Sequence, residues 1–348
     1  MIPRVICNPV VRLLVVIAAI LGYGHSSAYA QESRIAGPVT PQLIFSTYLG
    51  GKTPCKSCTS AHTFAQNCAT DNAGNTYVTG ATTVSDLPVS PNAWQKQPAA
   101  GSTTSAFVAK YSPAGKLLWC TYLGGNNQSV GVGVAVMPGG RVAVAGLTNS
   151  DKNGPFPTKN PFQAKYSGGG SDYFVTVFNG SGKVQYSTYL GGSGVEGTPG
   201  TATFDDDANN GNNIAADAQG LVYVTGTTNS GGSGAIKFPV TRNAIQKDLG
   251  GSEGKTDAFL SILNPNKSGA NSLVYSSFLG GDDDDKGHAV AVNAGGNLVT
   301  VVGYTKSSDF PTTTNAYRSY PAPSGFTSNG FVAQFKSSRP GNSQYTAL

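Results

Sequence analysis

Two runs of aspartate carry the side chains of this chain that are best suited to chemistry. They are Asp205, Asp206 and Asp207, and Asp282, Asp283, Asp284 and Asp285. Carboxylate oxygens are the hard ligands that calcium prefers, so the two runs predict a site for calcium or another polar ligand. Neither run has the complete spacing of a calcium-binding loop, and a solvated surface turn is the alternative interpretation.

Cysteines are the second candidate group, and four of them follow residue 30. They are Cys55, Cys58, Cys68 and Cys120. An even number outside the cytoplasm predicts disulfides, with three pairings open. A bridge from the segment 55–68 to Cys120 would join neighbouring repeats. The alternative is a zinc site built from Cys55, Cys58, His62 and Cys68. A c-type haem is disfavoured because Thr59, not histidine, follows Cys58.

Residues for catalysis are few. After residue 30 the histidines are His62 and His288, and His288 could be combined with Asp285 and a serine as in a hydrolase. No nucleophile-elbow pattern supports that reading. The segment 192–197 matches a dinucleotide-binding fingerprint only in its letters, because a Thr-Pro-Gly turn follows where a helix should begin. We therefore expect no catalytic residues.

The elements that must position these side chains are repeats. Tyr-Leu-Gly-Gly occurs at 48–51, 122–125 and 189–192, and returns as Phe-Leu-Gly-Gly at 278–281. Units that cannot bury their faces alone stack on one another. The chain therefore predicts an array of four units, which start near residues 43, 118, 184 and 273, within one domain at 43–348.

Each unit contains four strand-length blocks bounded by Gly, Asn, Asp and Pro. In the third unit they are 184–190, 213–217, 221–227 and 257–263. Neighbouring bulky residues such as Tyr189 and Leu190 must point to opposite faces of a strand, so both faces are buried. This pattern favours an all-β propeller with blades of four antiparallel strands over a two-layer sandwich. Four blades are favoured, and five are the alternative.

A proline-containing connection separates the third and fourth strand-length blocks of each unit. It carries Leu87, Phe156, Phe238 or Phe310 directly before Pro. We interpret these residues as apolar plugs beneath a loop rather than as binding residues.

Closure of the array can be predicted from the order of the blocks. The chain begins with a Tyr-Leu-Gly-Gly strand at 43–49 and ends with its usual preceding partner at 330–336. Pairing of these two segments would close the ring and protect its edges. Residues 344–348 resemble the start of a fifth such strand and would compete for the same place.

The first thirty residues predict a signal peptide. Arg4 and Arg12 precede the apolar run 13–21, and Ala28-Tyr29-Ala30 forms a small-residue cleavage site. The run is shorter than the roughly 20 residues that span a bilayer, and no later stretch is apolar enough to cross one. We expect an exported protein, periplasmic, at the cell surface or secreted, with a short linker at 31–42.

Charge excludes one class of partner. The net charge of +5 falls to +3 when the signal peptide with its two arginines is removed, and only 12% of the residues are charged. A nucleic-acid binder is expected to show a basic cluster, and none is present.

Three segments together resemble the bacterial SBBP beta-propeller repeat family. They are Tyr-Ser-Thr-Tyr-Leu-Gly-Gly at 186–192, Tyr-Val-Thr-Gly at 223–226 and Asp-Phe-Pro-Thr-Thr at 309–313. The resemblance spans about 43–336 and implies an exported or cell-surface propeller without shared catalytic residues. The chain departs from the family in having four lengthened units instead of seven.

These observations predict a non-catalytic exported scaffold that binds an envelope protein or a glycan through its loops, with no cofactor other than calcium. One alternative is an enzyme that acts on extracellular polysaccharide through paired carboxylates of the acidic loops. The other is a purely structural surface module.

Overall fold

The computed structural model describes residues 42–197, 213–231, 236–320, 328–337 and 345–347. The chain divides into two units, Met1–Leu43 and Ile44–Leu348. All described strands belong to the second unit. The predicted signal peptide, most of the predicted linker and Asp205, Asp206 and Asp207 lie outside the described residues.

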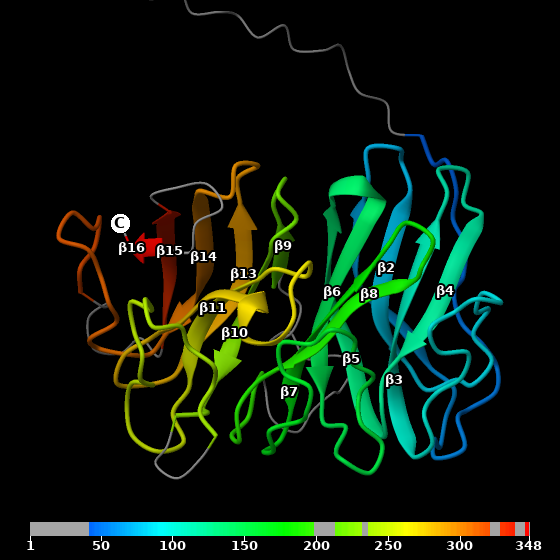
Figure 1. Ribbon diagram of the computed structural model, residues 1–348, viewed down its shortest axis with the longest axis horizontal. Coiled ribbons are helices and arrows are strands. Elements are labelled where there is room, and N and C mark those ends of the chain that lie inside the picture. The colour runs from blue at the N-terminus through cyan, green and yellow to red at the C-terminus, as the bar shows by residue number, and fades with distance from the viewer. Residues whose placement is uncertain (1–41, 198–212, 232–235, 321–327, 338–344, 348) are drawn as a thin grey trace, which may run out of the picture. The chain divides into compact units, whose positions relative to one another are not determined.

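The described strands form four antiparallel meanders in chain order, coloured from blue to red in Figure 1. The first is β1(Thr63–Thr70), β2(Thr76–Thr82), β3(Ser102–Tyr111) and β4(Leu117–Leu123), and the second is β5(Asn127–Met137), β6(Arg141–Thr148), β7(Asp172–Phe178) and β8(Val184–Leu190). The third is β9(Ile214–Ala216), β10(Val222–Thr228), β11(Asp257–Leu263) and β12(Leu273–Leu279), and the fourth is β13(Asp285–Val292), β14(Leu298–Thr305), β15(Asn329–Ser337) and β16(Tyr345–Ala347). Two short 3-10 helices, η1 at Pro138–Gly140 and η3 at Gly269–Ser272, lie in connections.

Within each meander, every strand pairs with the next one along the chain. A short parallel pairing of β3 with β5 also joins the first two meanders, at Ser102 with Asn127 and Thr104 with Gln128. The prediction of an all-β chain with short antiparallel strands is therefore confirmed. The predicted blocks at 184–190 and 257–263 coincide with β8 and β11.

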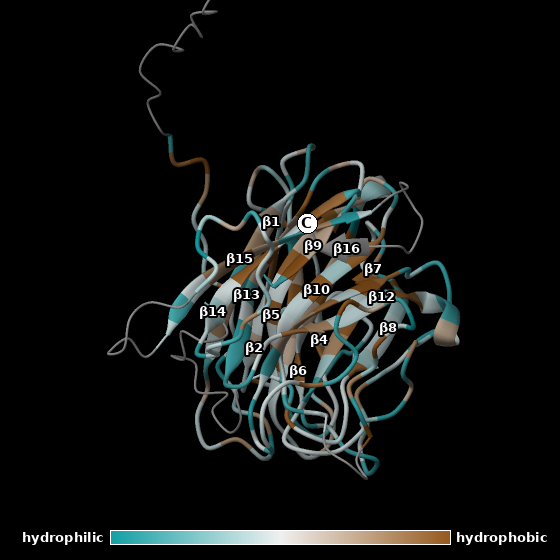
Figure 2. Cartoon of the chain, turned by 90° about the vertical axis from the view of Figure 1, so that its left-hand side faces the viewer, coloured by the Kyte–Doolittle hydropathy of each residue, from teal (hydrophilic) through white to brown (hydrophobic). Residues whose placement is uncertain are grey.

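Consecutive meanders pack face to face, which explains why both faces of the strands are apolar. Tyr77 and Trp119 of the first meander share a buried cluster with Phe178 of the second. Tyr173 of the second packs with Phe259 of the third, their rings 5.3 Å apart. Every residue of β7, β10 and β11 is buried, and Figure 2 shows hydrophobic residues gathered along the strands. Each fully buried Phe or Leu contributes about 1.5–3 kcal/mol.

Glycine recurs at the same position of the second strand because the first strand has a bulge opposite it. The first strand shifts register between Ala65 and Asn67 in β1, and between Gly131 and Gly133 in β5. A Cβ on Gly80 would lie 1.9 Å from the Phe64 carbonyl oxygen. A Cβ on Gly146 would lie 2.0 Å from a carbonyl oxygen of β5. Only glycine permits this approach.

The predicted plugs are confirmed in the first three meanders. Leu87, Phe156 and Phe238 are buried beneath their loops, and Phe310 of the fourth meander is partly buried. Phe156 stacks on Phe174 with ring centroids 4.4 Å apart.

Sheet boundaries fall one strand later than the sequence repeats. The Leu-Gly-Gly strand that opens a sequence unit is the fourth strand of the preceding meander, as β8 and β12 show. The two glycines then lead into the next meander. A Cβ on Gly281 would lie 2.2 Å from Oδ1 of Asp309, in the next meander.

The predicted pairing of 43–49 with 330–336 is not formed in the structure. Residues 43–49 form no strand, and β15 pairs with β14 and β16. Phe45 instead stacks on Tyr111 of β3, and Leu49 packs against the cluster that contains Tyr122. The strand at 345–347 thus occupies the edge for which it was expected to compete.

Within the residues that the structure describes, no helix has the length and apolarity needed to cross a membrane.

Candidate functional site

The acidic segment Asp282–Asp285 joins β12 to β13, and its first three side chains are engaged by neighbouring loops. Asp282 accepts hydrogen bonds from the backbone N–H and the hydroxyl of Ser308, both at 2.9 Å. Lys255 contacts Asp283 at 2.5 Å. Lys306 contacts Asp284 at 3.2 Å. The hydrogen bond and charge of Lys255 lower the pKa of Asp283. Asp283 and Asp284 therefore each face a lysine, whereas Asp282 is held by hydrogen bonds.

Asp285 differs because it is fully buried. Its Oδ2 accepts hydrogen bonds from the Gly281 N–H and the Ser307 hydroxyl, both at 2.7 Å. Its Oδ1 has no hydrogen-bond partner among the described residues. Burial raises the pKa of this carboxyl.

A second buried carboxyl faces Asp285 across Gly280. Asp257, the first residue of β11, binds the Gln246 side chain and the Gly250 N–H through Oδ2. A Cβ on Gly280 would lie 2.4 Å from Asp257 Oδ1 and 2.7 Å from Asp285 Oδ2, so the two groups converge there. Burial, with a smaller contribution from the charge of Asp285, raises the pKa of Asp257 to about 7.

The junction between the second and third meanders repeats this arrangement with Asp172 and Glu196. Both residues are fully buried. Their oxygens Asp172 Oδ1 and Glu196 Oε2 have no hydrogen-bond partner in the described part of the chain. A Cβ on Gly191 would lie 2.5 Å from the first oxygen and 2.8 Å from the second. Burial raises the pKa of Asp172 to about 9 and that of Glu196 to about 7.

Two facing carboxyls of this kind cannot both be ionised at low cost, because each oxygen is only an acceptor. A shared proton converts one carboxyl into a donor and satisfies both oxygens. At neutral pH we therefore describe Asp172 and Glu196 as one singly protonated pair. Since both side chains are fully buried, a polymeric substrate cannot reach them in this structure.

The first junction shows that the fold does not require acids at these positions. Ser105 and Ser129 take the equivalent places around Gly124. The Ser105 hydroxyl bonds that of Ser102, and the Ser129 hydroxyl bonds that of Thr148, both at 2.9 Å. The acid pairs are thus particular to the two later junctions.

Of the predicted site residues that the structure describes, it brings only Asp285 into such a pair. Asp172, Glu196 and Asp257 were missed because each is an isolated acid in the sequence. The signal that could have found them is positional. Asp172 and Asp257 are the first residues of β7 and β11, and Glu196 follows its Leu-Gly-Gly motif at the same spacing as Asp285, which an alignment of the four repeats would have shown.

The histidine constellation that the sequence disfavoured is not assembled by the hydrogen bonds of the described residues. His288 lies edge-on to Tyr304, with ring centroids 5.4 Å apart. Burial, and then the charge of Lys286, lowers the pKa of His288.

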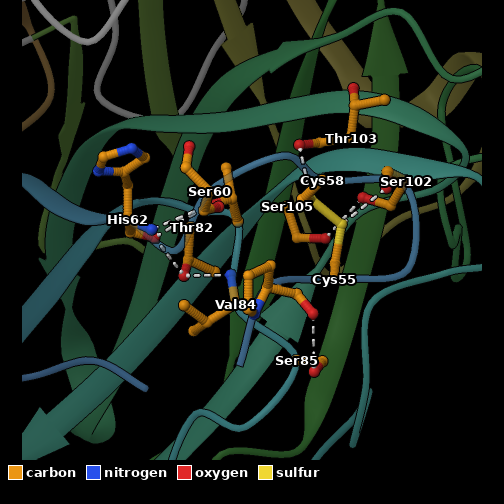
Figure 3. Close-up of a disulfide and its surroundings, with 12 residues drawn as sticks. Cys55, Cys58, Ser60, His62, Thr82, Val84, Ser85, Ser102, Thr103 and Ser105 are labelled. Carbon is orange, nitrogen blue, oxygen red and sulfur yellow. Dashed lines mark hydrogen bonds between the residues drawn. A yellow bond between two sulfur atoms is a disulfide. The ribbon is translucent and has the colours of Figure 1, made fainter. Parts of the chain in front are cut away.

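The cysteines form one disulfide in the described chain, Cys55–Cys58 (Figure 3). Cys55 Sγ lies 3.1 Å from the Ser102 carbonyl oxygen, and the Cys55 N–H donates to the Thr83 carbonyl at 2.7 Å. The bridge thus holds the inserted segment of the first repeat against the start of β3.

Of the pairings left open by the sequence, a bridge to Cys120 is not formed in the structure. Cys68 is exposed in β1, whereas Cys120 is fully buried in β4, and both are free thiols. Burial raises the pKa of Cys120 to about 12, which keeps it protonated. The zinc alternative is not assembled either: in the described ranges, no group of three or more His, Cys, Asp and Glu is placed to hold a metal ion.

A polar pocket of about 500 Å³ lies between loops of the second and third meanders. Its lining includes Ser193, Asn229, Ser230, Leu249, Ser252 and Glu253. Sequence reasoning missed this pocket because its residues come from three separate stretches of two connections, β8 to β9 and β10 to β11. Ser230 links it to the buried acids, since its hydroxyl donates to Glu196.

The family model of the SBBP beta-propeller repeat matches residues 44–88. This range contains the first Tyr-Leu-Gly-Gly motif, β1, β2 and the Leu87 plug. No curated protein is significantly similar in sequence to the chain.

Proposed function

We propose that this chain, with its SBBP beta-propeller repeat at residues 44–88, is an exported non-catalytic scaffold that binds a polar component of the cell envelope or surface. The pocket lined by Asn229, Ser252 and Glu253 is the observation that carries this proposal. Hydroxyl, amide and carboxylate groups in an open depression suit the hydroxyls of a glycan. A loop of an envelope protein with exposed polar groups is the other partner class.

The proposal includes four propeller blades, one for each meander. Face-to-face packing of consecutive four-stranded meanders supports this count. Export through the segment 1–30 is part of the same proposal. The disulfide Cys55–Cys58 supports it, because such bonds persist in oxidising compartments.

Calcium is the ion that we propose for the acidic segment Asp282–Asp285, whose carboxylates would rearrange around it, because they are not placed to hold a metal ion as they stand. Lys255 and Lys306 already neutralise two of its carboxylates. Since the charge of the ligand set controls calcium affinity, we expect weak binding, with a Kd of about 1 mM.

The test is a panel of bacterial and plant polysaccharides, offered to the purified protein with calcium and with a chelator. Binding and product release are recorded together. Glu253→Gln should weaken binding about tenfold, because a hydrogen bond to a charged group contributes about 1.5–3 kcal/mol. Asp248→Asn is the matched control, since Asp248 is a nearby exposed acid that pairs with Lys237 outside the pocket.

Each outcome has a distinct meaning. Binding that Glu253→Gln weakens and Asp248→Asn leaves unchanged supports the scaffold and its pocket. Release of sugar products would contradict a non-catalytic role, and silence across the panel would contradict the glycan as partner. Loss of binding in chelator would support calcium as a participant.

A further inference from the structure

The segment Ile44–Leu49 has the sequence of a fourth strand but does not occupy one. Its Tyr-Leu-Gly-Gly motif matches those that end β4 and β8. The aromatic residue of the motif is fully buried as Tyr122, Tyr189 and Phe278. Its equivalent Tyr48 is 102% exposed. In the other repeats the meander that contains this strand buries the aromatic residue, and no described meander does so for Tyr48.

The other repeats show what buries this aromatic residue. The Phe156 N–H donates to the Tyr189 hydroxyl at 2.7 Å, and that hydroxyl donates to the Ser150 carbonyl at 3.1 Å. Tyr122 makes the same two hydrogen bonds with the Leu87 N–H and the Val84 carbonyl. Each ring also lies beside the plug of its own meander.

Among the described residues, the fourth meander leaves the outer edge of β15 unpaired before Phe335. Its partner β16 pairs with it at Phe335, Lys336 and Ser337. By contrast, β11 pairs with β12 from Ala258 to Leu263. Val332 is 76% exposed, whereas the equivalent residues of β3, β7 and β11 are fully buried. They are Val108, Val175 and Leu260.

We propose that residues 44–49 of one copy of this chain pair with β15 of a second copy, so that copies associate head to tail. The register of the other meanders, in which Phe174 lies opposite Tyr189, places Tyr48 opposite Phe331. It also places Thr47 opposite Val332. The Tyr48 hydroxyl then accepts from the Phe310 N–H and donates to the Ser307 carbonyl, as Tyr189 does with Phe156 and Ser150.

The proposed interface repeats a contact that the chain already forms three times, between the third and fourth strands of its first three meanders. Phe310 stacks on Phe331 at 4.6 Å, as Phe156 stacks on Phe174 at 4.4 Å, so the plug for the incoming ring is in place. The added strand covers residues 330–334 of β15, and β16 covers 335–337, so the two do not compete. The glycines after the motif then lead the copy that supplies the strand into its own first meander, where Gly51 lies against Asp86.

The partner is a second copy of the chain, because residues 44–49 and the unpaired edge of β15 belong to opposite ends of the array. Contacts between meanders run in chain order, from β1 to β5, from β5 to β9 and from β9 to β13. No strand pairing among the described residues joins the first meander to the fourth. In its own chain, the segment is held on the first meander by Phe45 and Leu49.

Disulfide trapping between different copies tests the proposal. Thr47→Cys is placed in one preparation and Val332→Cys in another, both with the exposed Cys68 replaced by serine. Mixing the two under mild oxidation should give a covalent dimer that neither preparation gives alone. Thr47→Cys mixed with Gln334→Cys is the control for register and should give little dimer.

Association in solution provides a second measurement on the same contact. Sedimentation of the full chain should show concentration-dependent dimers or longer species, and Tyr48→Ala should raise their Kd about thirtyfold. Tyr317→Ala is the matched control, because Tyr317 is equally exposed. A strict monomer, or no mixed dimer, would overturn the proposal. A disulfide within a single chain carrying both Thr47→Cys and Val332→Cys would also overturn it, in favour of a closed ring.

Discussion

In the first, second and fourth meanders, a glycine of the second strand allows two backbones to approach closely because it has no Cβ. Gly80 and Gly146 each face a carbonyl oxygen of the bulged first strand at a distance that no side chain tolerates. The Val-Thr-Gly blocks of the sequence correctly predicted strands, yet they gave no sign of the bulge. A bulge is a property of the strand pair, and the sequence of one strand does not reveal it.

Replacement of Gly146 by alanine should therefore destabilise the protein strongly. Its Cβ would meet the backbone of β5, which cannot move without breaking the sheet, so we expect a loss of about 2–4 kcal/mol in unfolding free energy. Urea denaturation measures it. Gly330→Ala is the control, because the nearest atom to that Cβ is 3.9 Å away. Equal losses in both variants would contradict the explanation.

The buried acids predict how stability depends on pH. The pKa of Glu196 is raised to about 7 and that of Asp172 to about 9, whereas both groups titrate near 4 in an unfolded chain. Between these values the folded protein holds a proton that the unfolded chain has released. The contribution of this pair to the unfolding free energy is therefore largest in acid and falls as pH rises, by about 1.4 kcal/mol per pH unit for each proton retained.

Asp172→Asn should flatten this dependence, since an amide donates to Glu196 without titrating. Urea denaturation at pH 5, 7 and 9 compares the two proteins, with the exposed acid variant Asp248→Asn as control. The unfolding free energy of the variant should exceed that of the parent by the largest amount at pH 9. Parallel curves would show that the acids do not share a proton.

At the scale of elements, the repeat pattern predicted most strands but not the acid pairs. Strands are encoded locally, by alternating apolar residues between turn residues. Each acid pair forms where the fourth strand of one meander leads into the next meander. The sequence does not show this arrangement, because the sequence repeat is offset from the sheet by one strand. The strand predicted at 43–49 is absent for a related reason: a strand needs a partner, and no described strand pairs with these residues.

The plugs offer a measure of how complete each meander is. Phe156 is buried by both Phe174 and Tyr189, whereas Phe310 is only partly buried. Phe156→Ala should cost about 3–5 kcal/mol of unfolding free energy, and Phe310→Ala less than half of that. Chemical denaturation of the two variants under conditions that keep the protein monomeric makes the comparison. Equal costs would mean that the fourth meander is as fully packed as the second.

At the scale of the molecule, stability is shared between neighbours, as in other repeat arrays. The second and third meanders have neighbours on both faces, and their strands β7, β10 and β11 are buried throughout. In the fourth meander, β15 alternates between buried and exposed residues. Unfolding should therefore begin at that end.

Hydrogen exchange followed by mass spectrometry tests this order. Amides of β13, β14 and β15 should exchange faster than those of β7, β10 and β11, because local opening of a terminal meander exposes less apolar surface. The difference should shrink at high protein concentration if copies associate through β15. Uniform protection along the array would contradict both expectations.

The offset between sequence repeat and sheet has a consequence for how such genes can change length. Recombination at the Tyr-Leu-Gly-Gly codons inserts one fourth strand followed by the first three strands of the next sheet. The inserted fourth strand completes the sheet before it, and the fourth strand already present downstream completes the new one. A duplication or deletion at this point therefore adds or removes a whole sheet without creating an unpaired edge, so arrays of different lengths are reachable in single genetic steps.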